Sequence, residues 1–205
     1  MKVSIITVCK NERNSIEKTI KSVSFQLYKE IEHIIIDCGS TDGSLDLIIG
    51  AKNNNTNKII LLSEQDSGIY NAMNKGVKMA TGEILYFLNA NDCLLDENLI
   101  GDVVQSFKHT NAKFIYGGLK VVNNDSKVVD NYETTDIDKK FFMDGYNLCQ
   151  QSIFYKKELF DAYGFYDESF KILADYEFNL RLLIKNKIPY SNIKRPIAKD
   201  RKSTR

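Results

Sequence analysis

Four short apolar runs in the first half of the chain alternate with segments of helical spacing. The runs cover residues 2–8, 32–37, 58–63 and 83–88, and a polar loop follows each of them. Short apolar runs bounded by polar turns are typical of strands that are buried on both faces of a sheet. Strands that alternate with helices form parallel sheets with right-handed crossovers. The pattern therefore predicts an α/β fold with a mostly parallel central sheet.

The segments between these runs have the spacing of helices. Residues 14–17 read as a capping pattern, and apolar residues then recur at intervals of three or four. A second helix is expected around residues 45–49, before a polar surface loop at 53–57. The stripes expected to face the core are Ile16, Ile20, Val23 and Leu27 in the first helix and Ile69, Ala72, Met73, Gly76 and Ala80 in the third.

The pattern changes after a helix that is expected near residues 96–108. Residues 114–122 and 127–130 resemble strands around a polar turn at 123–126, which predicts a hairpin. Residues 136–145 are polar and aromatic without periodicity, as in a mobile loop over a site. The remaining expectations are a strand at 149–155, a short helix at 157–162 and an amphipathic helix at 173–185 with Leu173, Tyr176, Leu180, Leu183 and Ile184 inward.

Composition narrows the class of protein. With 205 residues, 43% of them hydrophobic, the chain is long enough for one domain with a substantial core. The 28 lysines and arginines nearly balance 27 acidic residues, so the charge does not indicate nucleic-acid binding. The sequence begins with a strand rather than a leader, and no apolar stretch approaches the roughly 18 residues of a membrane span. We expect a cytoplasmic protein, with peripheral contact at the inner face of the membrane left open.

The four cysteines are widely spaced. Cys9, Cys38, Cys93 and Cys149 form no C-x-x-C pair, which argues against a zinc site and a redox motif. They are expected to be free thiols in a reducing compartment.

Carboxylates follow all four predicted strands. Glu12, Asp37, Asp66 and Asp92 stand in the polar loops after them. Ligands of an open parallel sheet bind beyond the carboxyl ends of its strands. Clustered carboxylates repel one another unless they bind a cation or accept hydrogen bonds, so this edge is a candidate metal-dependent site. The alternative, ordinary turn and cap residues, stays open for the acidic turn at residues 89–92.

The order of motifs resembles that of the family 2 glycosyltransferases. The resemblance extends over nearly the whole chain, and the order and spacing of the pieces are more specific than any one of them. Residues 68–76 resemble the branch that builds bacterial surface polysaccharides. The matching pieces are 3–8 (VSIITV) with 11–12 (NE), 36–37 (ID) with 39–43 (GSTDG), 66–76 (DSGIYNAMNKG), 88–92 (LNAND), 151–152 (QS), and 174–177 (ADYE) with 180–182 (LRL).

The resemblance implies the GT-A fold, with a Rossmann-like nucleotide-binding half, a mostly parallel sheet flanked by helices, and a small acceptor-side hairpin region. Residues 1–205 would form a single domain. Within it, 1–108 would bind the nucleotide sugar, 109–198 would form the acceptor side, and 199–205 would be a basic flexible tail.

The resemblance also implies an inverting transfer from a nucleotide-diphosphate sugar, such as a UDP-sugar, to a glycan or lipid-linked acceptor in cell-surface polysaccharide biosynthesis. Asp92 would hold Mn²⁺ or Mg²⁺, and Asp175 would be the general base. Gln151 and Arg181 would contact the acceptor or the diphosphate. The nucleotide sugar would be bound by Thr7, Glu12, Asp37, Asp66, Asn74 and Asn91.

Three positions depart from the pattern of the family. Asn91 stands where an acid usually precedes the metal-binding Asp, Ala174 stands where an acid often precedes the base, and Gln150 replaces a common His. Relatives usually continue for some tens of residues past the helix of Asp175, so the resemblance implies either a short variant or a truncated chain.

Three other functions can be compared with the motifs. A truncated nucleotide-sugar-binding module with little or no transferase activity would keep the same pocket. A dinucleotide-dependent oxidoreductase requires G-x-G-x-x-G after the first strand, and residues 9–14 (CKNERN) contain no glycine. A sugar nucleotidyltransferase would need a glycine-rich basic loop near the N-terminus, which this sequence lacks.

Overall fold

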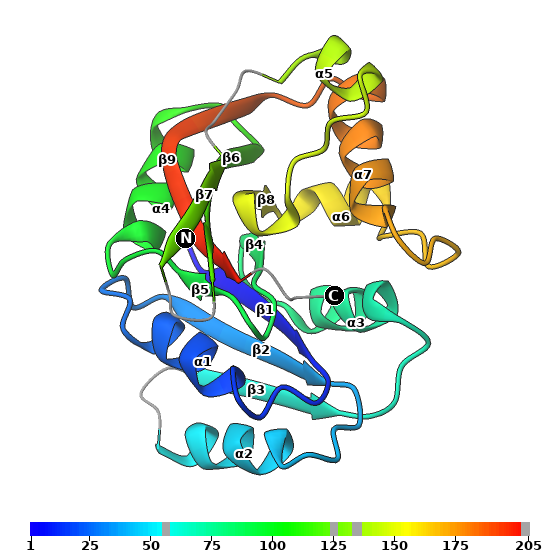
Figure 1. Cartoon of the computed structure of the whole chain (residues 1–205). Helices are drawn as coiled ribbons and strands as arrows, with labels where there is room; N and C mark the ends of the chain where they lie inside the picture. Colours follow the sequence, from blue (N-terminus) through cyan, green and yellow to red (C-terminus); the bar gives the residue numbers. More distant parts are fainter. Residues whose placement is uncertain (55–57, 124–126, 133–136, 202–205) are drawn as a thin grey trace.

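Four parallel strands form one side of the sheet, as the apolar runs predict. In this computed structural model, which describes residues 1–54, 58–123, 127–132 and 137–201, the order of these strands is β3, β2, β1, β4. Their register aligns Thr7 with Ile35 and Ile6 with Phe87. The carboxyl ends of the strands therefore lie along one edge (Figure 1). The strands are β1 (Val3–Cys9), β2 (Ile31–Asp37), β3 (Lys58–Ser63) and β4 (Ile84–Phe87).

The second half of the chain continues the same sheet. Strand β8 (Ile153–Lys156) is antiparallel to both β4 and β6 (Phe114–Val122), and so joins the two halves. Strand β7 (Val128–Tyr132) is antiparallel to β6, which confirms the predicted hairpin. Most of its turn, residues 124–126, lies outside the described residues.

Two strands were not predicted. Strand β9 (Tyr190–Arg201) runs parallel to β6 and pairs with the short β5 (Cys93–Leu94). The prediction of a flexible tail at 199–205 is therefore wrong for residues 199–201, because they belong to β9. Residues 202–205 lie outside the described residues. The sequence of β9 hides the strand because it mixes charged residues with few apolar ones.

Helices cover both faces of the sheet. Ile34 and Ile36 contact the cluster that contains α3, α6 and α7, whereas Ile35 faces α1 and α2. Helix α4 packs on the same side as Ile5 and Tyr86. The α-helices are α1 (Ile16–Ser24), α2 (Ser44–Asn54), α3 (Ile69–Met79), α4 (Leu99–His109), α5 (Lys139–Met143), α6 (Glu158–Tyr163) and α7 (Ala174–Asn179).

Several helical predictions need correction. Helix α2 extends through Asn54, into the expected loop, and α5 occupies half of the segment that was expected to be an irregular loop at 136–145. Residues 55–57 and 136 lie outside the described part. The predicted helix at 173–185 is α7 followed by a π-helical segment, η2 (Leu180–Lys185).

Three residues predicted to face the core are exposed. Leu27 lies beyond the end of α1, Ile69 is the first residue of α3, and Leu173 precedes α7 with a left-handed backbone, φ 69°. Phe178 and Leu182 are fully buried instead, because the helix begins one residue later and changes its winding in η2.

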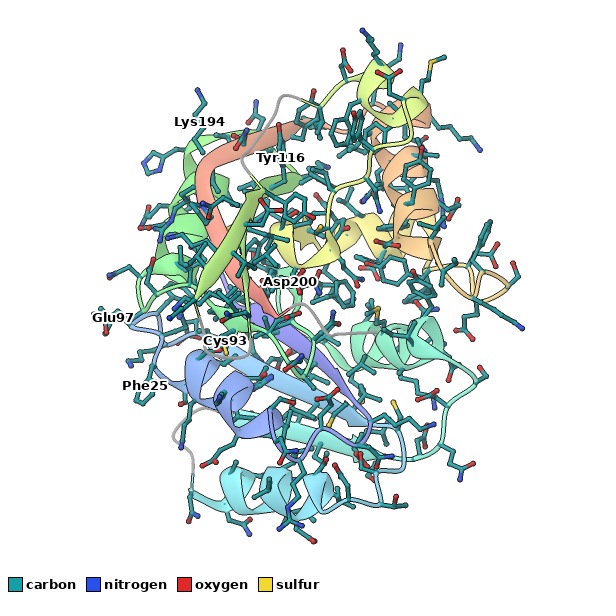
Figure 2. The ribbon with its side chains drawn as sticks, in the orientation of Figure 1. Phe25, Cys93, Glu97, Tyr116, Lys194 and Asp200 are labelled. Atoms are coloured by element: carbon teal, nitrogen blue, oxygen red, sulfur yellow. The ribbon has the colours of Figure 1, made fainter. Side chains whose placement is uncertain are left out.

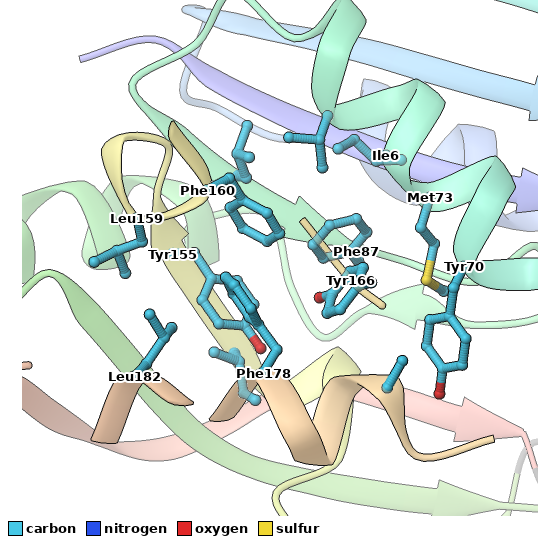
Figure 3. Packing of buried hydrophobic residues seen from close by; sticks show 14 of the residues in the cluster. Ile6, Tyr70, Met73, Phe87, Tyr155, Leu159, Phe160, Tyr166, Phe178 and Leu182 are labelled. Carbon is cyan, nitrogen blue, oxygen red and sulfur yellow. The ribbon is translucent and has the colours of Figure 1, made fainter. Parts of the chain in front are cut away.

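An aromatic cluster joins α3 to the second half of the chain. Phe160 stacks on Phe178 with ring centroids 4.5 Å apart, and Tyr166 packs edge-on against both rings (Figure 3). Phe87 of β4 contacts Tyr166 at 5.4 Å. Because these side chains are fully or almost fully buried, they fix α6 and α7 against the parallel half of the sheet.

Candidate active site

A pocket of about 370 Å³ lies beyond the carboxyl ends of β1, β2 and β4. It contains five residues that the sequence predicted for the site, Glu12, Asp66, Asn91, Asp92 and Gln151. The carboxyl edge of a parallel sheet is the expected place for a ligand. The complete lining is Val8, Lys10, Glu12, Cys38, Asp66, Ile69, Asn89, Ala90, Asn91, Asp92, Gln151 and Asp200.

The lining is strongly acidic. Four carboxylates, those of Glu12, Asp66, Asp92 and Asp200, face one cation, Lys10, among the described residues. A diphosphate that entered this pocket alone would meet repulsion from these groups. A bound divalent cation would offset most of this negative charge, so the pocket suits an anion that arrives with a metal ion.

Asp92 is held in place at the end of the β4 loop. It is 3% exposed, and its Oδ2 accepts a hydrogen bond from the Gln151 amide nitrogen at 2.9 Å. Its backbone oxygen accepts from the Thr19 hydroxyl at 2.8 Å. The Tyr86 hydroxyl in turn donates to the backbone oxygen of Gln151 at 2.7 Å. Gln151 thus orients the Asp92 carboxylate toward the pocket that both residues line.

Two carboxylate oxygens beside the pocket are buried without a hydrogen-bond partner among the described residues. They are Oδ1 of Asp37 and Oδ2 of Asp66. The other oxygen of Asp37 accepts from Ser63 at 2.7 Å and from the Ser40 backbone at 3.3 Å, and Oδ1 of Asp66 accepts from the Gly68 backbone at 2.8 Å. A buried acceptor without a donor is costly, and a ligand N–H or O–H would satisfy it.

Glu12 lies at the rim of the pocket. Its carboxylate accepts a hydrogen bond from the Ser15 hydroxyl, and its backbone N–H donates to Ser44 at 2.8 Å. The loop after β1 is therefore tied to the starts of α1 and α2.

Asp175 begins the first turn of α7, and both of its carboxylate oxygens accept hydrogen bonds. The Tyr70 hydroxyl donates to Oδ1 at 2.9 Å, and the Asn147 amide donates to Oδ2 at 3.3 Å. Burial and the Asp175 carboxylate raise the pKa of Tyr70 to about 12, so this hydroxyl stays protonated and remains a donor. These two bonds fix the orientation of the Asp175 carboxylate.

Cys149 is half-buried beside these groups. Burial raises the pKa of its thiol to about 11, and the carboxylates of Asp200, Asp175 and Asp92 act in the same direction. On either side of it in the chain, Asn147 donates to Asp175 and Gln151 donates to Asp92. The segment from Asn147 to Gln151 therefore joins Asp175 to the acidic pocket.

Thr7 and His33 form a buried pair. The Thr7 hydroxyl lies 2.9 Å from His33 Nε2, and burial lowers the pKa of His33 to about 3, so the ring is neutral. Thr7 is fully buried and does not line the pocket. The Thr7 hydroxyl therefore contacts His33 in the core, and its contact with the nucleoside stays a prediction.

Asn74 and Arg181 both contact the segment between α6 and α7, and their predicted ligand contacts stay predictions. The Asn74 amide donates to the Tyr166 backbone oxygen and to Glu168, and its oxygen accepts from the Tyr166 backbone nitrogen. Arg181 pairs with Glu177 and donates to the backbone oxygens of Tyr163 and Phe165. Neither side chain lines the pocket, and both hold the segment between α6 and α7.

Four residues of the site were missed in the sequence. Asp200, at the carboxyl end of β9, lies near the centre of the molecule (Figure 2). It was assigned to a tail because β9 carries no strand periodicity. The other three lie in or near motifs of the sequence, but only the fold places them at the site. They are Lys10, Tyr70 and Asn147.

The residues present suit a hard divalent cation that binds together with a phosphate ligand. Within the described part of the chain, no group of three or more His, Cys, Asp or Glu side chains could hold a metal alone. Mg²⁺ commonly uses one or two carboxylates and completes its shell with water and phosphate oxygens. Asp92 and Asp200, with the Asn91 amide beside them in the lining, match this donor set.

None of the helices in the described ranges combines the length and the apolar character that a membrane span requires.

Known proteins resemble the chain in sequence. It is 31% identical over 179 residues to a protein named PGL/p-HBAD biosynthesis glycosyltransferase from Mycobacterium bovis. This alignment covers 87% of this chain and 68% of that protein. It is 31% identical over 134 residues to an uncharacterized glycosyltransferase of Nostoc sp., which covers 65% of this chain and 41% of that protein.

Solved structures resemble the fold. The crystal structure of S. aureus TarS 1-349 in complex with UDP-GlcNAc has a TM-score of 0.80 at 19% identity, and covers 100% of this chain. This chain spans only 60% of that one. The mannosyltransferase PcManGT from Pyrobaculum calidifontis, in complex with GDP-Man and Mn²⁺, has a TM-score of 0.68 at 17% identity, with 95% and 55% of the two chains covered. Both neighbours support the GT-A fold.

The family assignment follows from the sequence profile. The profile described as Glycosyl transferase family 2 matches residues 4–165. This range includes nearly all of β1, the whole of β2 to β4, and the acidic turn at residues 89–92. Together with the fold, this match establishes that the chain belongs to glycosyl transferase family 2.

Proposed function

We propose that this chain is a metal-dependent, inverting glycosyltransferase that takes its sugar from a nucleotide-diphosphate donor, with UDP-sugars as the first candidates. Its acceptor would be a glycan or a lipid-linked molecule in cell-surface polysaccharide synthesis. The observation that carries the proposal is that one short segment contacts both carboxylates, because Asn147 donates to Asp175 and Gln151 donates to Asp92. A metal-binding edge and a base in one site are what an inverting displacement needs.

The donor would lie along the carboxyl edge of the sheet. The unpartnered oxygens of Asp37 and Asp66 would accept hydrogen bonds from the nucleoside. Asp92, oriented by Gln151, and Asp200 would hold Mn²⁺ or Mg²⁺, which when bound would neutralise charge on the diphosphate. Lys10 would add a second positive charge at the same phosphates. The neighbours whose structures contain UDP-GlcNAc or GDP-Man with Mn²⁺ support this class of donor.

The transfer step would depend on Asp175. Its carboxylate would take the proton of the acceptor hydroxyl, whose oxygen bonds to the anomeric carbon. The bond from that carbon to the diphosphate oxygen breaks on the opposite face, and the nucleoside diphosphate leaves with the electron pair. Tyr70 and Asn147 would hold the carboxylate in the orientation that this step requires.

The substitution Asp175→Asn tests the assignment of the base. The amide keeps the size of the side chain but cannot take a proton, so transfer or donor hydrolysis should fall by at least about 100-fold. Donor affinity, measured by calorimetry, should change little, because Asp175 does not line the donor pocket. A variant that loses donor binding, or that keeps full turnover, would contradict this role.

A further inference from the structure

A second cavity, of about 600 Å³, lies between the β6–β7 hairpin and residues 141–152. Its volume is in the range of sites that bind small molecules. No charged side chain lines it among the described residues. Its apolar walls are formed by Tyr116, Leu119, Tyr132, Phe141, Tyr146 and Leu148.

The cavity and the donor pocket share a wall. This wall is the segment around the 3₁₀ turn η1 (Gln150–Ser152), of which Gln151 lines the donor pocket, whereas Cys149 and Ser152 line the cavity. A molecule in the cavity would therefore lie beside the donor.

Asn147 connects the cavity to the base. Its side chain belongs to the cavity lining and donates a hydrogen bond to Asp175 Oδ2 at 3.3 Å. Its oxygen accepts from the Asn179 amide at 3.4 Å, and Asn179 accepts from the buried Tyr155 hydroxyl at 3.0 Å. This chain of bonds fixes the polar contact between the cavity and Asp175. The Asp175 carboxylate therefore lies one hydrogen bond beyond the cavity lining.

The lining indicates what kind of group would bind. Aromatic and leucine side chains without a charged partner favour an apolar, uncharged ligand, because a polar one would lose its water without compensation. We propose that the cavity binds the apolar aglycone of the acceptor, an aryl or short alkyl group, and so presents the acceptor hydroxyl to Asp175. This inference rests on the proposed transferase function and names the class of its acceptor.

Methyl-resolved NMR of the full chain tests the proposal. The methyl groups of Leu119 and Leu148 report on the cavity, and those of Val8 and Ile69 report on the donor pocket. Phenyl β-glucoside and hexyl β-glucoside should shift the two leucines and bind at least about tenfold more tightly than methyl β-glucoside. UDP with Mg²⁺ should shift Val8 and Ile69.

Substitutions at exposed aromatic residues sharpen the test. Tyr132 and Tyr146 are 49% and 63% exposed, so replacing both by Ala should leave the fold intact while weakening phenyl β-glucoside binding about tenfold. Met143→Ala is the matched control, because Met143 is 74% exposed on α5 and does not line the cavity.

Three results would overturn the proposal. The first is equal affinity for phenyl β-glucoside and methyl β-glucoside, and the second is unchanged affinity for phenyl β-glucoside in the double variant. The third is maltotriose that binds at Leu119 and Leu148 more tightly than phenyl β-glucoside, which would assign the cavity to a saccharide. If UDP still shifts Val8 and Ile69 in these cases, only the aglycone proposal fails. If UDP with Mg²⁺ shifts nothing, the proposed function fails as well.

Discussion

At the scale of single residues, neighbours decide what each carboxylate does. Glu32 is buried, and its oxygens accept hydrogen bonds from Ser4, the Thr81 backbone and the Thr81 hydroxyl, with Lys2 as an ion-pair partner at 2.5 Å. Asp37, at the other end of the same strand, keeps one oxygen without a partner among the described residues. All these bonds leave the first side chain saturated, so it stabilises the fold, whereas the second is buried with one acceptor unsatisfied among the described residues.

Glu32 should make stability depend on pH. Burial acts to raise its pKa, but the bonds from Lys2, Ser4 and Thr81 outweigh it and lower the pKa from 4.5 to about 2. The stabilisation is therefore complete above about pH 4.5 and is lost as the pH falls toward 2. Glu32→Gln should lower the free energy of unfolding at pH 7 by about 3 kcal/mol, as measured by urea denaturation.

The difference between wild type and Glu32→Gln should shrink as the pH is lowered through the acidic range. Glu30→Gln serves as the control, because Glu30 is exposed and should show a difference within about 0.5 kcal/mol at every pH. A deficit for Glu32→Gln that stays constant down to acidic pH would contradict the charged role of this residue.

The sequence predicted only part of the candidate site, because many of its contacts join residues that are far apart along the chain. The residues that follow strands, such as Asp66 and Asp92, could be located because parallel strands end at one edge. The partners of Asn74 lie about 90 positions further along the chain, and Thr7 meets His33 across 26 positions. Such hydrogen-bond partners come together only when the chain packs. The local sequence pattern therefore could not show that Asn74 and Thr7 have partners within the protein.

At the scale of elements, apolar periodicity predicted the parallel strands and the first helices because each of these buries a regular face. It missed β9, whose pairing with β6 lets a charged sequence form a strand. It also misjudged the face of α7, because the helix begins after a left-handed Leu173 and changes to a π-helix. Neither feature follows from apolar spacing.

Helix α3 lies so close to β1 that it has no room for a side chain at Gly76. A Cβ there would be 2.4 Å from Ile6 Cγ2. Alanine is favoured over glycine in helices by up to about 1 kcal/mol, but overpacking costs about 1–3 kcal/mol. Gly76→Ala should therefore destabilise the protein by about 1–2 kcal/mol in thermal or urea unfolding.

Gly101→Ala is the matched control in α4, because nothing lies within 4 Å of a Cβ at that position. It should stabilise the protein by about 0.5–1 kcal/mol. If both variants were stabilised equally, the close packing of α3 on β1 would be wrong.

The segment between α6 and α7 depends on Arg181. Its guanidinium donates to Tyr163 and Phe165 backbone oxygens at 2.6 and 3.1 Å, and lies over the Phe178 ring. Arg181→Ala should lower the free energy of unfolding by about 2 kcal/mol and leave UDP affinity within about twofold. Urea unfolding and calorimetry measure the two effects.

Lys185→Ala, at an exposed position at the end of η2, should change stability by less than about 0.5 kcal/mol. A large loss of UDP affinity in Arg181→Ala, with stability unchanged, would instead support the diphosphate contact that the sequence predicted.

At the scale of the whole molecule, one continuous sheet carries a pocket and a cavity on either side of η1. The parallel half contributes most of the acidic pocket, and residues of β6, β7 and 141–152 line the apolar cavity. Strand β9 crosses back to bring Asp200 into the acidic pocket. The segment from Asn147 to Ser152 thus contacts the acidic pocket, the Asp175 carboxylate and the apolar cavity.

Calorimetric titration of UDP into the protein, with Mn²⁺ or with EDTA, tests this account most directly. Because four carboxylates line the pocket, UDP should bind with Mn²⁺ and at least about tenfold more weakly in EDTA. Asp92→Ala should reduce binding with Mn²⁺ to the level in EDTA, whereas Asp46→Ala, an exposed control on α2, should not. Equal affinity with and without the metal, or no binding in either condition, would contradict the central claim.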